Sequence, residues 1–202
     1  MKIFFSPKTQ NHSPKTFISR GHVIESPERA ERADILRTAA ENAGHTITEI
    51  FSEHHHSALD IHDEAYISFL KNGWQQWSIL DGSSDEIIPN VHPGRNMNAN
   101  PSAIVSAAGY YQADTACPIG EKTWEGAKAS ADTVIAAASN LLDRHKNNEH
   151  ENFVYSLCRP PGHHAYADQA GGFCFLNNCA IAANFFLMQG LTKIAILDVD
   201  VH

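Results

Sequence analysis

An apolar run that ends in three regularly spaced ionisable residues constrains the fold of this chain more than any other feature. The sequence closes on KIAILDVDVH, in which Asp198, Asp200 and His202 occupy every second position. Side chains alternate between the two faces of a β-strand, so these three would point the same way. The pattern predicts that 193–201 is a strand with ionisable groups at its carboxyl end.

The residues that precede this strand complete a β-loop-α-β unit. FVYSLC (153–158) is typical of a strand, and FLNNCAIAANFFLMQG (175–190) is typical of a mostly apolar helix. Strands this apolar are usually buried on both faces, which predicts a parallel sheet covered by helices. In such sheets ligands bind at the carboxyl ends of the strands.

The rest of the chain predicts further elements of the same α/β class. Apolar spacing, capping residues and glycines define their limits. Strands are expected at 2–5 and 46–51, helices at 26–44, 63–77, 103–112 and 123–145, and loops at 8–26 and 81–122. Ser26 is expected to cap the first helix, and the second helix is expected to bury Tyr66, Phe69, Leu70 and Trp74.

Length, charge and cysteine content limit the class of protein. A chain of 202 residues can bury the core of one domain. Its formal net charge of −8 argues against nucleic acid as a partner and is compatible with a cationic ligand. The four cysteines form no Cys-x-x-Cys pair, and the sequence predicts neither a signal peptide nor a membrane-spanning run. We therefore expect a cytoplasmic protein with no membrane partner.

The chemistry of the final run suits a metal site. Carboxylate and imidazole groups are common zinc ligands and also bind manganese or iron. Only two of the three groups would fit one ion naturally, because neighbours at i and i+2 lie about 6.5–7 Å apart at Cα. The third carboxylate would then orient a histidine from behind. The alternative is a strand that simply ends in solvent.

The loop after the strand at 153–158 carries a second group of reactive residues. It contains RPPGHH, in which His163 and His164 are adjacent, followed by Gly171, Gly172 and Phe173. Paired histidines can move protons at neutral pH, and glycines let the backbone approach a ligand closely. Most His-His pairs are ordinary surface residues, but proline, glycine and an aromatic residue surround this one.

The segments RPPGHHA, GGFCFLNN and ILDVDVH, in this order and spacing, resemble the zinc-dependent histone deacetylase superfamily. The match is strong over 153–202 and weaker over 1–80. The segment 109–130, with the long loop before it, looks most like the acetylpolyamine amidohydrolase branch.

The resemblance implies an arginase-like deacetylase fold, with a central parallel sheet and helices on both faces. It implies that Asp200 and His202 bind one Zn²⁺ ion. Asp198 would accept a hydrogen bond from His163 and help to bind a structural K⁺ ion. The loop 81–122 would be an insertion at the rim of the active site.

The resemblance also implies roles in catalysis and substrate binding. His164 would be the main general base and acid, with His163 as its electrostatic partner. Gly172 and Phe173 would line the tunnel that takes the acetylated chain, and Asp114 matches an acid at the rim that grips the substrate.

The activity implied is hydrolysis of the amide bond of N-acetylated amines, with release of acetate. Small cationic substrates such as acetylpolyamines are favoured, because the chain is acidic and the long loop would narrow the entrance. A homodimer formed through this loop is expected to contribute to the narrowing. The alternatives are a deacetylase of acetyl-lysine proteins, a ureohydrolase-like enzyme with two manganese ions, and a non-catalytic protein that binds acetylated ligands.

Two residues that the family uses have no counterpart here. A third zinc ligand, an aspartate, and usually a tyrosine that polarises the carbonyl follow the DVDVH motif in that family. We therefore expect 1–202 to be a single deacetylase-type domain whose C-terminal part is missing. The 202-residue chain alone is expected to be inactive, with its last strand exposed at a sheet edge.

Overall fold

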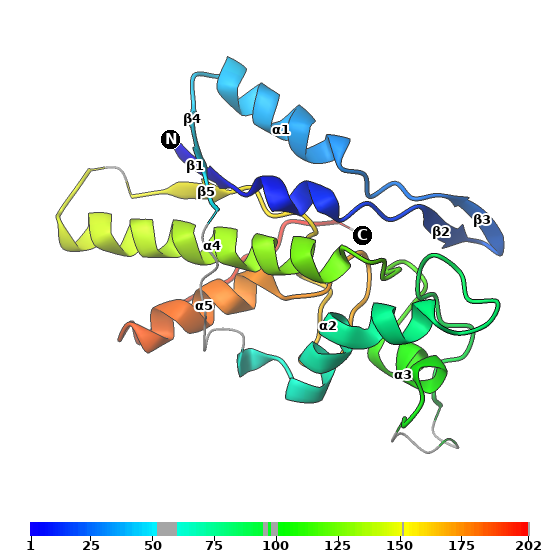
Figure 1. Ribbon diagram of the computed structural model, residues 1–202. Helices are drawn as coiled ribbons and strands as arrows, with labels where there is room; N and C mark the ends of the chain where they lie inside the picture. Colours follow the sequence, from blue (N-terminus) through cyan, green and yellow to red (C-terminus); the bar gives the residue numbers. More distant parts are fainter. Residues whose placement is uncertain (52–59, 95–96, 98–100, 151, 202) are drawn as a thin grey trace.

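Three parallel strands form the centre of the molecule (Figure 1). The computed structural model describes residues 1–51, 60–94, 97, 101–150 and 152–201. β1 (Lys2–Phe5) lies between β4 (Thr46–Glu49) and β5 (Val154–Ser156). Ile3 of β1 pairs with Ile47 of β4 and is buried, as expected for an apolar strand with a neighbour on each side.

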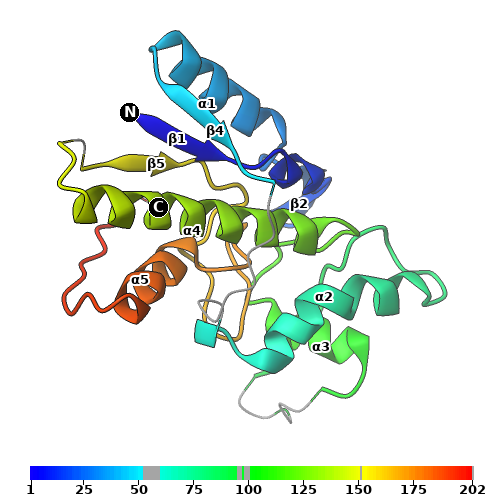
Figure 2. The same ribbon diagram turned by 60° about the vertical axis from the view of Figure 1, so that its left-hand side comes forward.

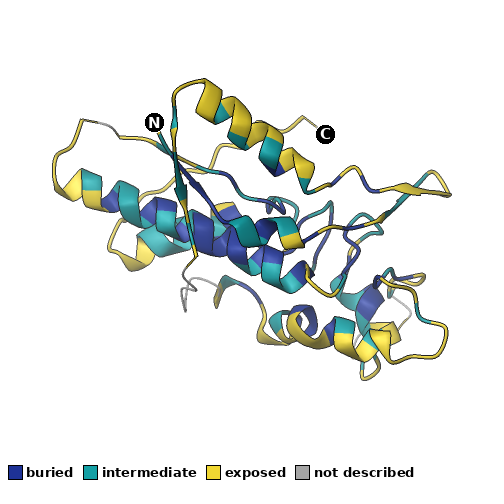
Figure 3. Cartoon of the chain, turned by 45° about the horizontal axis from the view of Figure 1, so that its top comes forward, coloured by how far each residue is buried: buried dark blue, intermediate teal, exposed yellow. Residues whose placement is uncertain are grey.

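Helices cover both faces of this sheet. α1 (Glu31–Asn42) packs on β4, whereas α4 (Thr123–Lys146) packs on β1 and β5 and carries α5 (Asn178–Met188) on its other side. Figure 1 shows α1 and α4 on opposite sides of the strands. Small residues such as Ala127 and Ala131 let α4 approach its neighbours closely, and Figure 3 shows its long buried stripe. The expected α/β class is therefore confirmed.

The main apolar core lies between α4 and a helix pair on the same side of the sheet (Figure 2). α2 (Glu64–Ser78) begins at Asp63, whose carboxylate accepts hydrogen bonds from the backbone of Ala65 and Tyr66. α3 (Ile104–Tyr111) packs against it. Three of the four side chains expected to be buried in α2 are buried, and Trp74 is partly buried against the same core. Among the described residues, no helix is both long and apolar enough to cross a bilayer.

The expectation of a loop over 8–26 is wrong. A short 3-10 helix, η1 (Pro7–Asn11), is followed by a hairpin of β2 (Thr16–Ser19) and β3 (His22–Glu25). The hairpin turns at Arg20 and Gly21, which both have positive φ, at 51° and 81°. Such a turn matches the twist of the two strands. The sequence did not predict the hairpin, because an arginine stands where asparagine or aspartate usually marks this type of turn.

The first helix begins later than its capping pattern suggests. α1 starts at Glu31, so Ser26 and Pro27 lie before it and not in its first turn. The Ser26 hydroxyl instead accepts a hydrogen bond from the Glu28 backbone at 3.2 Å. This local bond satisfies the segment without a helix, which is the usual competition between serine side chains and helical hydrogen bonds.

The prediction of a strand at 193–201 is also wrong. No described residue of this segment pairs with a strand, and Leu197 and Val199 are 87% and 79% exposed. A strand is stabilised by hydrogen bonds to its neighbours, and the described residues of this segment form no ladder with β4, β1 or β5. The apolar pattern therefore identifies a segment suited to a β-sheet, but the described residues supply no strand that pairs with it.

A buried histidine joins the N-terminal segment to α4. His12 Nδ1 lies 3.1 Å from the Thr123 hydroxyl, and its ring meets the edge of Phe175 at 5.1 Å. A Cβ added at Gly126 would lie 2.6 Å from His12 Cβ, so the backbones are in close contact there. Burial, and secondarily the charge of Arg159, lowers the pKa of His12 from 6.5 to about 3.

We expect this histidine to make the fold less stable in acid. The folded state keeps His12 neutral down to about pH 3, whereas the unfolded chain binds the proton below 6.5. Stability is therefore lost as the pH falls from 6.5 towards 3, with a slope of up to about 1.4 kcal/mol per pH unit from this one group. Urea unfolding across this range should show a shallower slope for His12→Asn than for the wild type.

The matched control is His22→Asn, at an exposed position on β3. That variant should keep the wild-type slope. An unchanged slope in His12→Asn would contradict the assignment of the pH dependence to His12.

Candidate active site

The two adjacent histidines and the acidic run come together in the structure. His163 Nδ1 donates a hydrogen bond to Asp198 Oδ2 at 2.9 Å, and its Nε2 lies 3.8 Å from Asp200 Oδ2. The rings of His163 and His164 are 4.3 Å apart, inclined at 58°. Two imidazoles and two carboxylates that are distant in sequence thus form one cluster.

Asp198 is placed to act as an ionised support. Its carboxylate accepts from the backbone N–H of Asp200 at 3.0 Å as well as from His163. These two hydrogen bonds, the backbone one first, lower the pKa of Asp198 below its usual value. A carboxylate held in this way fixes the imidazole orientation and places its N–H on Nδ1.

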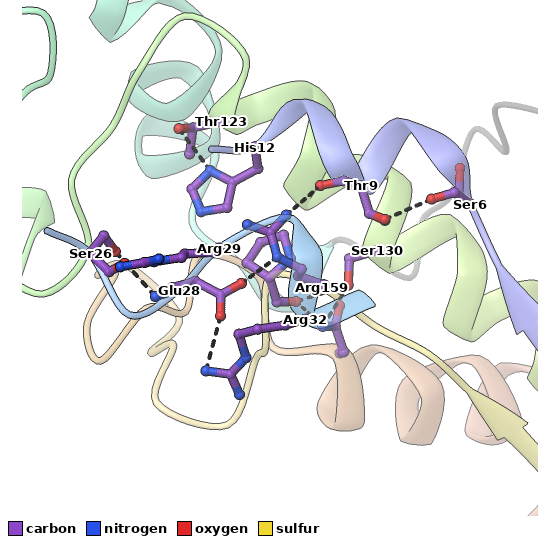
Figure 4. A network of polar contacts seen from close by, with 12 residues as sticks. Ser6, Thr9, His12, Ser26, Glu28, Arg29, Arg32, Thr123, Ser130 and Arg159 are labelled. Atoms are coloured by element: carbon purple, nitrogen blue, oxygen red, sulfur yellow. Dashed lines mark hydrogen bonds and ion pairs between the residues drawn. The ribbon is translucent and has the colours of Figure 1, made fainter. Parts of the chain in front are cut away.

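The loop that carries the histidines is fixed at its start by a buried ion pair. Arg159 Nε lies 2.7 Å from Glu28 Oε1, and both side chains are almost inaccessible, at 5% and 2% exposure. Arg159 Nη1 also donates to the carbonyl of Thr9 at 2.9 Å. Figure 4 shows Arg159 between Glu28 and Thr9, with Arg32 on the far side of Glu28. The N-terminal segment therefore supports the loop that carries the two histidines.

Burial acts against both charges of this pair. It raises the pKa of Glu28 and lowers the pKa of Arg159, although the partner's charge opposes each shift. Because of this desolvation, the pair adds little to the net stability of the fold. Removing one partner, however, lowers the free energy of unfolding strongly. Its effect is to fix where the loop begins.

Two helices hold the next part of the loop. The carbonyl of Pro160 accepts from the Ser130 hydroxyl of α4 at 3.0 Å and from Asn178 Nδ2 of α5 at 3.3 Å. A Cβ at Gly162 would lie 2.5 Å from both the Asn178 nitrogen and the Leu176 carbonyl oxygen. Glycine is therefore required immediately before the two histidines, because α5 begins against the loop there.

A third histidine, His62, connects the end of the loop to the start of α5 by hydrogen bonds. His62 Nε2 accepts from the backbone N–H of Asn177 at 3.0 Å, so its proton lies on Nδ1, which faces the Tyr166 carbonyl at 3.0 Å. Burial lowers the pKa of His62, which favours this neutral form. Asn177 caps α5 by accepting from Ala180 N at 3.0 Å. Sequence reasoning assigned His62 no role because its partners lie more than a hundred residues away.

A tight turn at Gly172 and Phe173 closes over the second histidine. The two residues have φ values of 51° and 67°. A Cβ added at Gly172 would lie 2.4 Å from His164 Cδ2, so only glycine lets the backbone come this close to the imidazole. The hairpin supplies a neighbour that sequence reasoning missed, since the Phe17 ring lies 5.5 Å from that of Phe173. Phe17 was missed because the sequence predicted a loop over 8–26, and a loop residue gives no periodic pattern that would place it near the site.

Asp114 also reaches this turn. Its Oδ2 accepts from Gly172 N at 2.9 Å and its Oδ1 from Ala116 N at 2.8 Å. It therefore lies beside the expected tunnel residues, and its expected contact with substrate stays a prediction.

The described part of the site is compatible with a metal but does not form a complete set of ligands. Its carboxylate and imidazole donors are of the kind that zinc prefers, and Asp200 lies next to His163. His202, the other expected ligand, lies outside the described residues. Within the described ranges, no three His, Cys, Asp or Glu side chains are grouped closely enough to hold an ion.

Comparison with known proteins gives this site a context. The family model for the histone deacetylase domain matches residues 23–202. The chain is 37% identical to acetylpolyamine amidohydrolase 1 of Pseudomonas aeruginosa over 89% of its own length and 50% of that protein. It is 35% identical to the acetylpolyamine amidohydrolase of Mycoplana ramosa, covering 100% of this chain and 58% of that protein. The chain spans about half the length of the curated relatives it matches.

A solved structure supports the same relationship. The acetylpolyamine aminohydrolase from Burkholderia pseudomallei superimposes with a TM-score of 0.83 at 36% identity, covering 93% of this chain and 53% of that one. The deacetylase fold that the motifs implied is therefore confirmed.

We expect the buried pair at the start of the loop to be costly to break. Glu28→Gln keeps the shape of the side chain but leaves the Arg159 charge buried without its partner. Its unfolding free energy should fall by about 3–5 kcal/mol, measured by urea denaturation.

The control is Asp85→Asn, which breaks the Lys15–Asp85 pair, 72% and 83% exposed. An exposed pair contributes about 1 kcal/mol or less, so this variant should unfold almost as the wild type does. Similar losses in both variants would contradict the special position of Glu28 and Arg159.

Proposed function

Because the chain belongs to the histone deacetylase domain family, we propose that the whole protein is a zinc-dependent amidohydrolase that removes acetyl groups from N-acetylated amines. The observation that carries the proposal is the pair His163 and His164, with His163 hydrogen-bonded to Asp198 and adjacent to Asp200. The two histidines would transfer protons, with His163 beside the candidate metal ligand Asp200 and His164 against the turn at Gly172.

Asp200 and His202 would hold the zinc ion, and a structural potassium ion would lie beside Asp198. Bound zinc would polarise the acetyl carbonyl and lower the pKa of a water molecule towards 7. His164 takes the proton from the attacking water and returns it to the leaving amine. His163, oriented by Asp198, balances the charge that develops on its neighbour. The products are acetate and a free amine.

Acetylpolyamines are the proposed substrates. Two observations support them: the net charge of −8 suits a cationic amine, and several relatives are named acetylpolyamine amidohydrolases. The segment 81–122 reaches the site through Asp114, and we propose that it narrows the entrance, with a homodimer formed through it. The free cysteines fit a cytoplasmic location.

The substrate class can be tested by direct competition. Acetate release by the whole protein should show kcat/KM for N-acetylputrescine at least about ten-fold above that for an acetyl-lysine peptide, a difference of about 1.4 kcal/mol in transition-state binding. A preference for the peptide would replace the polyamine assignment with protein deacetylation. Urea release from guanidino substrates would favour the ureohydrolase alternative.

The proton-transfer role of His164 predicts a large kinetic defect. His164→Ala should lower kcat for N-acetylputrescine by about 10²–10⁴-fold, the usual contribution of general acid–base catalysis. The control is His150→Ala, at an exposed position after α4, which should keep wild-type kcat. Near-normal turnover by His164→Ala would rule out this histidine as the base.

A further inference from the structure

The Asp114 side chain joins the segment after α3 to the turn over His164. Both of its carboxylate oxygens accept backbone hydrogen bonds, Oδ2 from Gly172 and Oδ1 from Ala116. The segment is also held in place by its backbone, since Ala113 N donates to the Ala170 carbonyl at 2.7 Å. Asp114 is therefore presented to the turn from a fixed position.

The backbone at Gly172 leaves little room for movement of the turn against His164. Gly172 and Phe173 both have positive φ, and a Cβ at Gly172 would already overlap the His164 ring. The backbone at Gly172 is thus in van der Waals contact with the imidazole. A shift of a few tenths of an ångström there would move either His164 or the Phe173 side chain.

A carboxylate is well suited to hold such a turn. Hydrogen bonds to an ionised acceptor are about twice as strong as those between neutral groups. Two of them on one carboxylate fix the distance between Gly172 and Ala116. The bond also fixes the direction of the Gly172 N–H, and with it the peptide plane that faces His164.

We propose that Asp114 is a positioning residue, which holds the Gly172 backbone against the His164 imidazole and so fixes the geometry of the proton-transfer step. This inference rests on the proposed function and deepens it. It differs from a grip on the substrate, because Asp114 acts through Gly172 whatever the charge of the substrate.

The kinetic test compares a cationic and a neutral substrate of equal length. Asp114→Asn keeps one acceptor but turns an amide NH₂ towards the other backbone N–H. In the whole protein it should lower kcat about 10- to 100-fold for both N-acetylputrescine and N-acetylbutylamine, with little change in the ratio of their KM values. A rise in KM confined to N-acetylputrescine would overturn the proposal and show that Asp114 binds the cation.

A double-mutant cycle shows whether the effect passes through Gly172. Gly172→Ala should lower kcat similarly, and the double variant should lose little more than the worse single variant. Additive losses would overturn the proposal. Asp143→Asn, at an exposed position on α4 and outside the 81–122 segment, is the control and should keep wild-type kinetics.

A measurement without substrate separates this inference from the proposed function. Amide hydrogen exchange at Gly172 should be slow in the wild type and at least about ten-fold faster in Asp114→Asn, because the variant weakens the hydrogen bond from that N–H to the Asp114 carboxylate. Unchanged exchange would overturn the positioning role even if the enzyme is active. If neither N-acetylated amine is hydrolysed by the wild type, the proposed function fails while the exchange result still decides the contact.

Discussion

The hydrogen bond from His163 to Asp198 connects the two motifs on which the site depends. One motif lies on a loop that hydrogen bonds hold at Arg159, Pro160 and Tyr166, and the other lies on a segment without a described strand partner. Proton transfer requires the imidazoles to be fixed relative to the carboxylates to within a fraction of an ångström. The anchored loop fixes the position of His163, and the hydrogen bond from His163 in turn fixes Asp198, to which the Asp200 backbone is bonded.

Several buried polar groups contact this loop or the elements that hold it, and each of them is costly to bury. Glu28 and Arg159 lose their hydration, and His12 and His62 are held neutral by burial. Such groups add little net stability, but removing one partner leaves the other unsatisfied. Their arrangement around the loop favours a single loop conformation, so local order at the site is obtained at some expense to the stability of the fold.

The sequence predicted what depends on local pattern and missed what depends on distant partners. The apolar spacing of α2 and the glycines at 171 and 172 followed from side-chain period and backbone freedom. The hairpin was missed because its turn uses Arg20, and the strand at 193–201 was overpredicted because pairing is not a local property. The Glu28–Arg159 pair and the Asp114–Gly172 bond join residues far apart in the chain, so no spacing could reveal them.

The account's central claim is that Asp200, beside the His163–Asp198 pair, is one of the ligands of a single zinc ion. The most direct test is the metal content of the purified whole protein and of its Asp200→Asn variant, measured by inductively coupled plasma mass spectrometry. The account predicts one zinc per chain in the wild type and its loss in the variant. Two manganese ions per chain, or zinc retained in Asp200→Asn, would contradict it.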